Sequence, residues 1–234
     1  MDDGRVVVVT GGAGAIGTAV RQRFARGGDR PVGIDLRGGD GVVEADVASE
    51  DSLAAAFAEI RSAYGPPAVL VHAAGITGAG TVLDEPPDAW RRILDVNLTS
   101  AYLCAREVIP DMRAAGGGHI ALVASVTGRF GGSRLSGPAY AVSKGGLLTL
   151  ARFLAREHAA DGIVVNAVAP GPHDTPMWDA LDEANRARML AMIPGGRGPF
   201  DPADLAAAIV FLCSPEARSI TGATLDVNGG QWMG

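Results

Sequence analysis

The chain has 234 residues, 47% of them hydrophobic and 20% charged, and its net charge is −6. An acidic chain without a basic run is a poor match for nucleic acid, which needs clustered Lys and Arg. No apolar run approaches the length of a membrane span. Because the N-terminus also lacks the apolar segment of a signal peptide, we expect a cytoplasmic protein without membrane contact.

One α/β domain spanning residues 1–234 is the organisation that this length predicts. The 33 glycines exceed average usage, which indicates tight turns or backbone that approaches a ligand. Cys104 and Cys213 lie in apolar, helical-looking segments and match no metal-ligand spacing. We therefore predict buried free thiols and no metal site.

A glycine-rich turn separates the first predicted strand from the first predicted helix. Val6–Val9 is typical of a parallel strand buried on both faces, and 18–26 is helical. Between a strand and a helix, such a turn binds pyrophosphate through backbone N–H groups; an ordinary tight turn is the alternative. The candidate dinucleotide-binding residues here are Thr10, Gly11, Gly14, Ala15, Ile16 and Gly17.

Acidic residues follow the next two predicted strands. Strand 31–35 ends in Asp35, whose carboxylate can accept hydrogen bonds from the adenosine ribose and would repel a 2′-phosphate. NAD is therefore favoured over NADP, with Arg37 interpreted as a solvated loop residue. After the strand at 42–45, the Asp46 carboxylate beside Val47 either reaches the adenine edge or caps the following helix.

Strand and helix patterns alternate through the middle of the chain. Residues 49–64 form an amphipathic helix, 68–71 a buried strand and 72–75 a turn. Such units imply a doubly wound sheet, which collects ligands at the carboxyl ends of its strands. A long helix is predicted over 88–112. Within it, the buried amide of Asn97 needs partners, either structural ones or a functional water.

Lys144 is the only lysine among 20 basic residues, and it lies four positions after Tyr140. On a helix the two side chains share one face, one turn apart. A cation beside a phenol lowers the phenol pKa from about 10, so Tyr140 becomes a usable acid or base; chance spacing is the alternative. The preceding strand, 120–125, places the Ser125 hydroxyl at the binding edge of the sheet, and the glycine-rich loop 128–134 follows.

The last part of the chain contains a strand at 163–166, an irregular loop at 170–175, a helix at 202–214 and a final strand beginning at Thr224. Residues 176–199 carry apolar side chains between flanking prolines. This pattern predicts a small lid over a substrate, with simple core packing as the alternative. The sequence shows no internal repeat and no second domain.

In this order and spacing, the motifs resemble the short-chain dehydrogenase/reductase family, specifically its compact single-domain branch. The likeness covers nearly the whole chain. It implies a Rossmann-type α/β fold with a doubly wound, seven-stranded parallel sheet flanked by helices, and a small alcohol or ketone as substrate. The cofactor contacts that it implies beyond the glycine turn are Asp35, Asp46, Val47, Ala73, Ala74, Gly75, Tyr140, Lys144, Pro170, Gly171 and Thr175.

The resemblance also implies catalytic roles for four residues. Tyr140 would exchange a proton with the substrate oxygen, while Lys144 would lower the pKa of Tyr140 and hold the nicotinamide ribose. Ser125 would hydrogen-bond the substrate oxygen as negative charge develops. Asn97 would fix a water that links Lys144 to solvent, and Thr175 would help orient the nicotinamide carboxamide.

Association is a further implication, because relatives usually form tetramers through the helices that contain Asn97 and Tyr140. We therefore expect a homotetramer or homodimer. The candidates for an apolar contact face on the second helix are Ala141, Leu147, Leu148 and Leu154.

The chain departs from the family pattern at several positions. Ala15 replaces a usual glycine and gives the turn a spacing similar to that of larger sugar-nucleotide epimerases and dehydratases, whose added substrate domain this length cannot hold. His72 stands where asparagine is usual, which leaves the hydrogen bonding of that turn open. Around 133–136 a small insertion lies beside the predicted site and could shape specificity.

The leading hypothesis is an NAD-dependent oxidoreductase that transfers a hydride between the cofactor and a secondary alcohol or ketone. One alternative is a non-catalytic dinucleotide sensor that kept the fold, although such proteins typically lose the Tyr or the Lys. Another is an epimerase that works by transient oxidation. For a polar group of the substrate, the candidate partners are Arg129, Arg134 and His173.

Overall fold

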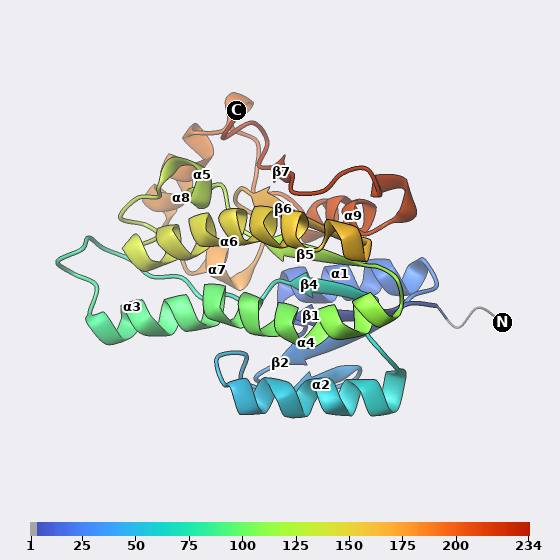
Figure 1. Ribbon diagram of the computed structural model, residues 1–234. Coiled ribbons are helices and arrows are strands. Elements are labelled where there is room, and N and C mark those ends of the chain that lie inside the picture. Colours follow the sequence, from blue (N-terminus) through green and yellow to red (C-terminus); the bar gives the residue numbers. More distant parts are fainter. Residues whose placement is uncertain (1–3) are drawn as a thin grey trace.

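A single parallel sheet organises residues 4–234, which the computed structural model describes. The strands are β1 (Val6–Thr10), β2 (Arg30–Asp35), β3 (Val42–Glu44), β4 (Val69–His72), β5 (Gly118–Val123), β6 (Ile163–Pro170) and β7 (Thr224–Val227). They form a seven-stranded sheet in the order β3-β2-β1-β4-β5-β6-β7 (Figure 1). All six pairings are parallel, so the predicted doubly wound Rossmann-type fold is confirmed.

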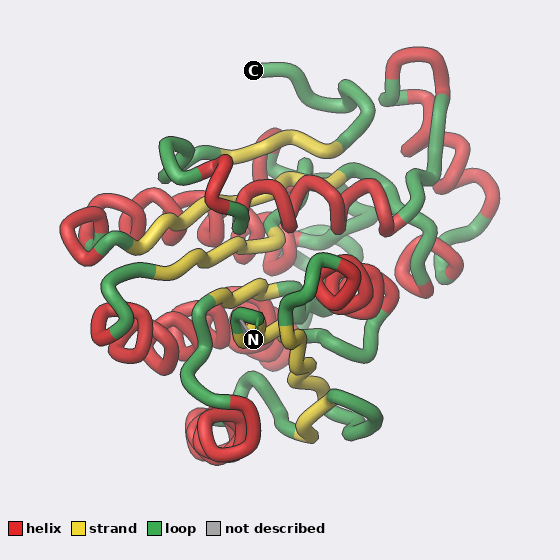
Figure 2. The backbone as a smooth tube through the Cα atoms, turned by 90° about the vertical axis from the view of Figure 1, so that its right-hand side faces the viewer, coloured by secondary structure: helices red, strands yellow, loops and turns green. Residues whose placement is uncertain are grey.

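Helices cover both faces of this sheet (Figures 1 and 2). The α-helices are α1 (Ala15–Arg26), α2 (Glu50–Tyr64), α3 (Pro87–Leu94), α4 (Ser100–Ala114), α5 (Thr127–Phe130), α6 (Pro138–Glu157), α7 (Pro176–Asp179), α8 (Glu183–Ala191) and α9 (Pro202–Leu212). A π-helical turn spans Asp95–Thr99, and short 3-10 turns span Ala159–Asp161, Pro194–Gly196 and Pro215–Ala217. One face of the sheet packs against α2, α4 and α6, and the other packs against α1 and α9.

The central strand β1 is buried on both faces, as its β-branched run predicts. Val6 and Val8 point into the layer of α2, α4 and α6, whereas Val7 and Val9 point into the layer of α1 and α9. Successive side chains of a strand alternate between faces, so a strand covered on both sides must be apolar throughout.

The long helix predicted over 88–112 is interrupted. It begins as α3, widens into the π turn Asp95–Thr99 and continues as α4. The π turn contains Asn97, whose side chain is fully buried. Turns of this kind occur mostly singly inside α-helices, often at functional sites, and an apolar stripe does not reveal them.

Three further boundaries differ from the sequence prediction. β5 ends at Val123, so Ser125 lies two residues beyond the strand. The loop predicted over 128–134 contains most of the short helix α5. β6 runs to Pro170 rather than ending at 166, because it pairs with β5 on one side and β7 on the other.

The segment 176–199 folds as α7 and α8 beyond the carboxyl end of β6 (Figure 1). Trp178 and Ile193 are buried, whereas Met177 and Met192 are exposed. The segment therefore has features of both alternatives, since it anchors itself on apolar contacts and also presents methionines to solvent.

The apolar face expected for association is part of the core. Ala141, Leu147, Leu148 and Leu154 are all buried within the chain, because α6 packs them against the sheet. The exposed large apolar side chains of the two long helices are Tyr102 on α4 and Val142 and Phe153 on α6.

Cys104 and Cys213 are buried free thiols, as predicted. Between residues 4 and 234, no cluster of three His, Cys, Asp or Glu side chains could hold a metal ion. Within the same range, no helix is long and apolar enough to cross a membrane.

Replacing a core leucine of the central sheet will test this packing. Leu70 on β4 is fully buried, so Leu70→Ala will leave a cavity and lower the free energy of unfolding by about 2–5 kcal/mol. Leu83, with 96% of its surface exposed, provides a matched control whose change to Ala will cost less than about 0.5 kcal/mol. Urea unfolding followed by circular dichroism measures both, and equal losses would contradict the packing described.

Candidate active site

The glycine turn leaves the N-terminus of α1 open to an anion. Gly14 caps α1 without a side-chain hydrogen bond, and the first turn carries no acidic residue. A Cβ on Gly17 would collide with the carbonyl oxygen of Gly11, so glycine alone lets α1 pack this closely. The free N–H groups of a helix N-terminus attract phosphate oxygens, and this geometry fits the pyrophosphate of a dinucleotide.

Thr10 connects the first glycine turn to the turn after β4. Its side chain is completely buried, and its hydroxyl accepts hydrogen bonds from the N–H groups of Ala73 and Ala74, both at 3.2 Å. Its place as a cofactor contact therefore stays a prediction. The two bonds tie the end of β1 to the turn after β4, which shapes the crevice between these two strands.

Asp35 lies beside the glycine turn, as the spacing predicts. Its Oδ2 accepts a hydrogen bond of 3.0 Å from the N–H of Ala13, so the carboxylate at the end of β2 faces the crevice where the strand order changes direction. The Arg37 side chain is exposed, which agrees with its interpretation as a solvated loop residue.

Asp46 does not cap the helix that follows it. Its Oδ1 accepts from the N–H of Ala48 at 2.9 Å and its Oδ2 lies 3.3 Å from a guanidinium nitrogen of Arg92. Ser49 provides the cap of α2, accepting from the N–H of Ser52. The capping alternative is wrong, and the carboxylate stays at the sheet edge beside the buried Val47.

The Asn97 amide is fully engaged with protein groups. Its Oδ1 accepts from the N–H of Ile76 at 2.8 Å, and its Nδ2 donates to the carbonyl of Ile76 at 2.9 Å and to Ser143 Oγ at 3.0 Å. Ser143 Oγ donates in turn to the carbonyl of Tyr140 at 2.8 Å. The side chain therefore has the structural partners that its burial requires, and it links the loop after β4 to α6.

Ser125, Tyr140 and Lys144 lie together at the carboxyl end of β5. Tyr140 and Lys144 share one face of α6, with the ammonium 5.7 Å from the centre of the phenol ring. The Ser125 hydroxyl lies near the tyrosine hydroxyl, close enough to act on the pKa of Tyr140. Lys144 is almost fully buried, and its Nζ donates to the carbonyl of Val123 at 2.8 Å. The three side chains that the sequence singled out are thus brought into one site.

The expected fall in the Tyr140 pKa does not occur in the protein alone. Burial raises the pKa of Tyr140, and the nearby Ser125 hydroxyl offsets this only in part. Burial also lowers the pKa of Lys144 to about 8. The ammonium points at the Val123 carbonyl, and desolvation of both groups outweighs their mutual attraction.

His72, which stands where asparagine is usual, is buried beside Ser100. Its Nε2 lies 2.7 Å from Ser100 Oγ, which donates to the carbonyl of Val96 at 2.6 Å. Because the serine hydrogen is already used, Nε2 must be the donor, and Nδ1 has no hydrogen-bond partner among the described residues. Burial, reinforced by the charge of Lys144, lowers the His72 pKa to about 3. His72 thereby ties β4 to the π turn.

Two more predicted cofactor contacts frame the site. A Cβ on Gly75 would lie 3.3 Å from Lys144 Nζ and 3.4 Å from Asn97 Oδ1, so this glycine keeps the space over them open. Thr175 accepts from the N–H of Trp178 and so caps α7. The remaining predicted contacts lie at strand ends along the same edge of the sheet, namely Ala73, Ala74, Pro170 and Gly171.

Residues 13–231 match the family model described as enoyl-(acyl carrier protein) reductase. The chain is 35% identical to a 3-oxoacyl-(acyl-carrier-protein) reductase of Vibrio cholerae serotype O1, over 99% of this chain and 98% of that protein. The chain belongs to the short-chain dehydrogenase/reductase family. The resemblance expected from the sequence is confirmed, and with it the oxidoreductase class.

Other members of the family share the whole length of the chain. A cis-4-hydroxycyclohexanecarboxylate dehydrogenase of Sinomonas cyclohexanicum is 39% identical, over 97% of this chain and 96% of that protein. A 2-dehydro-3-deoxy-L-rhamnonate dehydrogenase (NAD(+)) of Sphingomonas sp. is 34% identical, over 97% and 95%. The crystal structure of gox2181 superposes with a TM-score of 0.92 at 29% identity, over 98% of this chain and 96% of that chain.

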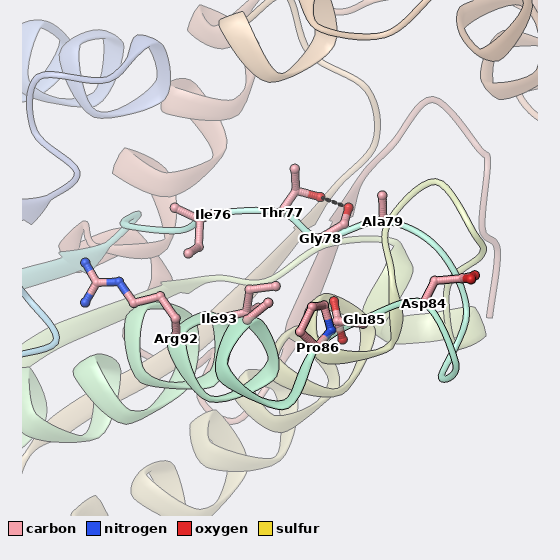
Figure 3. Close-up of a pocket in the computed structure, with 10 residues that line it drawn as sticks. Ile76, Thr77, Gly78, Ala79, Asp84, Glu85, Pro86, Arg92 and Ile93 are labelled. Carbon is pink, nitrogen blue, oxygen red and sulfur yellow. Dashed lines mark hydrogen bonds between the residues drawn. The ribbon is translucent and has the colours of Figure 1, made fainter.

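A pocket of about 300 Å³ lies between the loop after β4 and α3 of this family member (Figure 3). Ile76 and Arg92 line one end, and Asp84 and Glu85 line the other. Of the three side chains expected to contact a polar substrate group, only Arg134 is exposed. Arg129 is held by Asp226 at 2.8 Å, and His173 is buried.

Ser143 and Ser100 also belong to the site, although no motif in the sequence singles them out. Both are fully buried on the helices that carry the predicted residues, and each relays a hydrogen bond between a buried side chain and a backbone carbonyl. A serine in the apolar interior of a helix is a weak signal, since such a residue commonly bonds to the carbonyl four residues before it.

The buried Lys144 gives a pH-dependent stability whose sign follows from its pKa. Below about pH 8 the ammonium is charged in both states and its burial costs stability. Between about pH 8 and 10.5 the unfolded chain binds the extra proton, so stability rises with pH. Relative to Lys144→Met, the wild-type free energy of unfolding will improve by about 2.5 kcal/mol between pH 7 and 10. Urea titrations of both proteins measure this, and a pH-independent difference would contradict a lowered Lys144 pKa.

Proposed function

We propose that this chain is an NAD(H)-dependent dehydrogenase or reductase of secondary alcohols and ketones. The observation that carries the proposal is the convergence of Ser125, Tyr140 and Lys144 at the carboxyl end of β5. Gly75, after β4, leaves room above the lysine, and the open N-terminus of α1 follows β1, two strands along the sheet from β5. A proton-transferring group and a cofactor crevice therefore share one edge of the sheet.

NAD is the cofactor that these residues favour. The Asp35 carboxylate lies beside the glycine turn, where the adenosine ribose of a dinucleotide is bound in this fold. A 2′-phosphate there would face a like charge. The name of one relative, the 2-dehydro-3-deoxy-L-rhamnonate dehydrogenase, also specifies NAD(+) as its cofactor. Asp46 and Val47 continue this edge toward the adenine.

The bound cofactor supplies the hydride, and the protein supplies the proton and the orientation. In reduction the Tyr140 hydroxyl protonates the substrate oxygen, and in oxidation the phenolate removes the alcohol proton. Ser125, close to the tyrosine hydroxyl, donates to the same oxygen as negative charge builds up. The cation of Lys144 favours the phenolate. After each reduction, a proton from solvent, passed through Lys144, restores the Tyr140 hydroxyl.

The substrate is proposed to be a small secondary alcohol or ketone. A cyclohexanecarboxylate dehydrogenase and a deoxysugar-acid dehydrogenase are among the relatives that the whole chain matches, and both act on hydroxyl-bearing or oxo-bearing carboxylates by name. Arg134, exposed on the loop before α6, is the cation available for such a carboxylate. The segment 176–199 would close over the bound substrate as a lid.

We also propose that the protein associates with copies of itself. Tyr102, Val142 and Phe153 are exposed apolar side chains on α4 and α6, and a helix face of this kind is typical of a homodimer or homotetramer contact. A cytoplasmic location remains a prediction.

Removing the tyrosine hydroxyl separates catalysis from binding. Tyr140→Phe will lower kcat by at least about a thousandfold, since it removes the proton donor, while the dissociation constant for NADH changes less than about threefold. Spectrophotometric assays with a panel of secondary alcohols and ketones measure kcat, and fluorescence titration measures binding. The exposed Tyr102 gives the control change, Tyr102→Phe, which will leave kcat intact. An active Tyr140→Phe would contradict the assigned role.

Cofactor choice depends on the charge of Asp35. Asp35→Ser will lower the ratio of kcat/KM with NAD to kcat/KM with NADP by at least about tenfold, equivalent to about 1.4 kcal/mol of relieved repulsion. Parallel assays with the two cofactors measure the ratio. A wild-type preference for NADP would show that the Asp35 argument fails even if the enzyme is active.

A further inference from the structure

The N-terminus of α6 has no local cap. Gly137 occupies the capping position without a side chain, and Pro138 at the first helical position has no N–H. The first donor of the helix is therefore the N–H of Ala139, which a free helix would leave to solvent or to a capping side chain. This donor lies immediately before Tyr140.

Glu85 supplies that cap from a distant loop. Its Oε2 accepts from the Ala139 N–H at 2.9 Å, across 54 positions of sequence. Two glycines make room for the carboxylate, because a Cβ on Gly78 would collide with Oε1 and a Cβ on Gly137 would lie 2.8 Å from it. Gly137 has a φ of 71° as well, so this position strongly favours glycine. Figure 3 shows Glu85 next to Pro86, at the end of the loop that lines the pocket.

The loop that carries Glu85 is held at both ends to the catalytic elements. At its start, Ile76 is paired with the Asn97 amide through its N–H and its carbonyl. Further along, the Gly80 N–H donates to the Arg134 carbonyl at 2.8 Å. The loop 76–86 therefore connects the π turn to the first turn of α6, and Glu85 is its contact nearest to the tyrosine.

We propose that Glu85 is a positioning residue for Tyr140, anchoring the first turn of α6 and placing a negative charge beside the base of the tyrosine. The proposal rests on the proposed function of Tyr140. Misplacement of a reacting group by about 1 Å can cost a hundredfold in rate. A carboxylate at a helix N-terminus also offsets the positive end of the helix dipole, which otherwise favours the phenolate.

Other charged groups face this contact. Lys144 lies one turn further along α6, Asp84 lies beside Glu85 on the same loop, and Arg134 on the facing loop is 3.8 Å from Asp84. Arg92 on α3 lines the same pocket. The substitutions below leave all four unchanged, so their effects report on Glu85.

The test compares Glu85→Ala with Glu85→Gln, and Asp88→Asn provides the control. Asp88 is an exposed acid in the first turn of α3, and its carboxylate contacts Arg91. Hydrogen-deuterium exchange reports the anchor without any need for turnover: Glu85→Ala will speed exchange at residues 139–142 and leave α1 unchanged. Glu85→Ala will lower kcat at least about tenfold while the NADH dissociation constant changes less than twofold.

The pH profile separates the charge from the anchor. Glu85→Gln keeps an acceptor for the Ala139 N–H but removes the charge, so the rise of kcat/KM with pH in alcohol oxidation will move about half a unit lower. Asp88→Asn will not move it. Three results would each overturn the proposal: unchanged exchange at 139–142, an unchanged pH profile in Glu85→Gln, or a cofactor affinity that falls as much as kcat. If the wild type shows no turnover, the proposed function fails, and the exchange result still decides whether Glu85 anchors α6.

Discussion

The burial of the Lys144 ammonium is the constraint on which the rest of the site depends. A charged group out of water is costly unless it finds partners, and Lys144 has one hydrogen bond, to the Val123 carbonyl. This bond fixes α6 against the end of β5, which places Tyr140 beside Ser125. Glycine is required nearby because a side chain at Gly75 would fill the space above the ammonium, and one at Gly128 would meet the α6 backbone at 2.7 Å.

A second set of buried polar contacts, made by Asn97 and His72, connects α6 to the elements around it. The Asn97 amide bonds to Ile76 and Ser143, and the neutral His72 bonds to Ser100. These side chains join the π turn to β4, to the loop after it and to α6. Most of the buried polar atoms of the site are thus paired with one another, with His72 Nδ1 an exception among the described residues. This pairing explains why α6 can carry a lysine and a serine within an apolar layer.

Much of this arrangement was predictable from the sequence because it follows local rules. The apolar run of β1, the glycine turn and the acid at Asp35 each reflect a requirement of a parallel sheet that binds a dinucleotide. The spacing of Tyr140 and Lys144 follows from helix geometry. What escaped prediction depends on tertiary contacts: the π turn at Asn97, the two bonds that Thr10 receives, and the cap that Glu85 provides from 54 positions away. The predicted direction of the Tyr140 pKa shift was wrong, because the spacing of the sequence shows the nearby cation but not the desolvation of the phenol.

Transfer of a labelled hydride tests directly whether this site moves a hydride and a proton between NAD(H) and a carbonyl group. NADH carrying deuterium at the transferred position of its C4 is incubated with the wild-type protein and a panel of secondary ketones. We expect an alcohol product with the deuterium on the carbinol carbon, detected by mass spectrometry. Tight NADH binding with no labelled alcohol from any ketone would contradict this expectation and would indicate a dinucleotide-binding protein without catalysis.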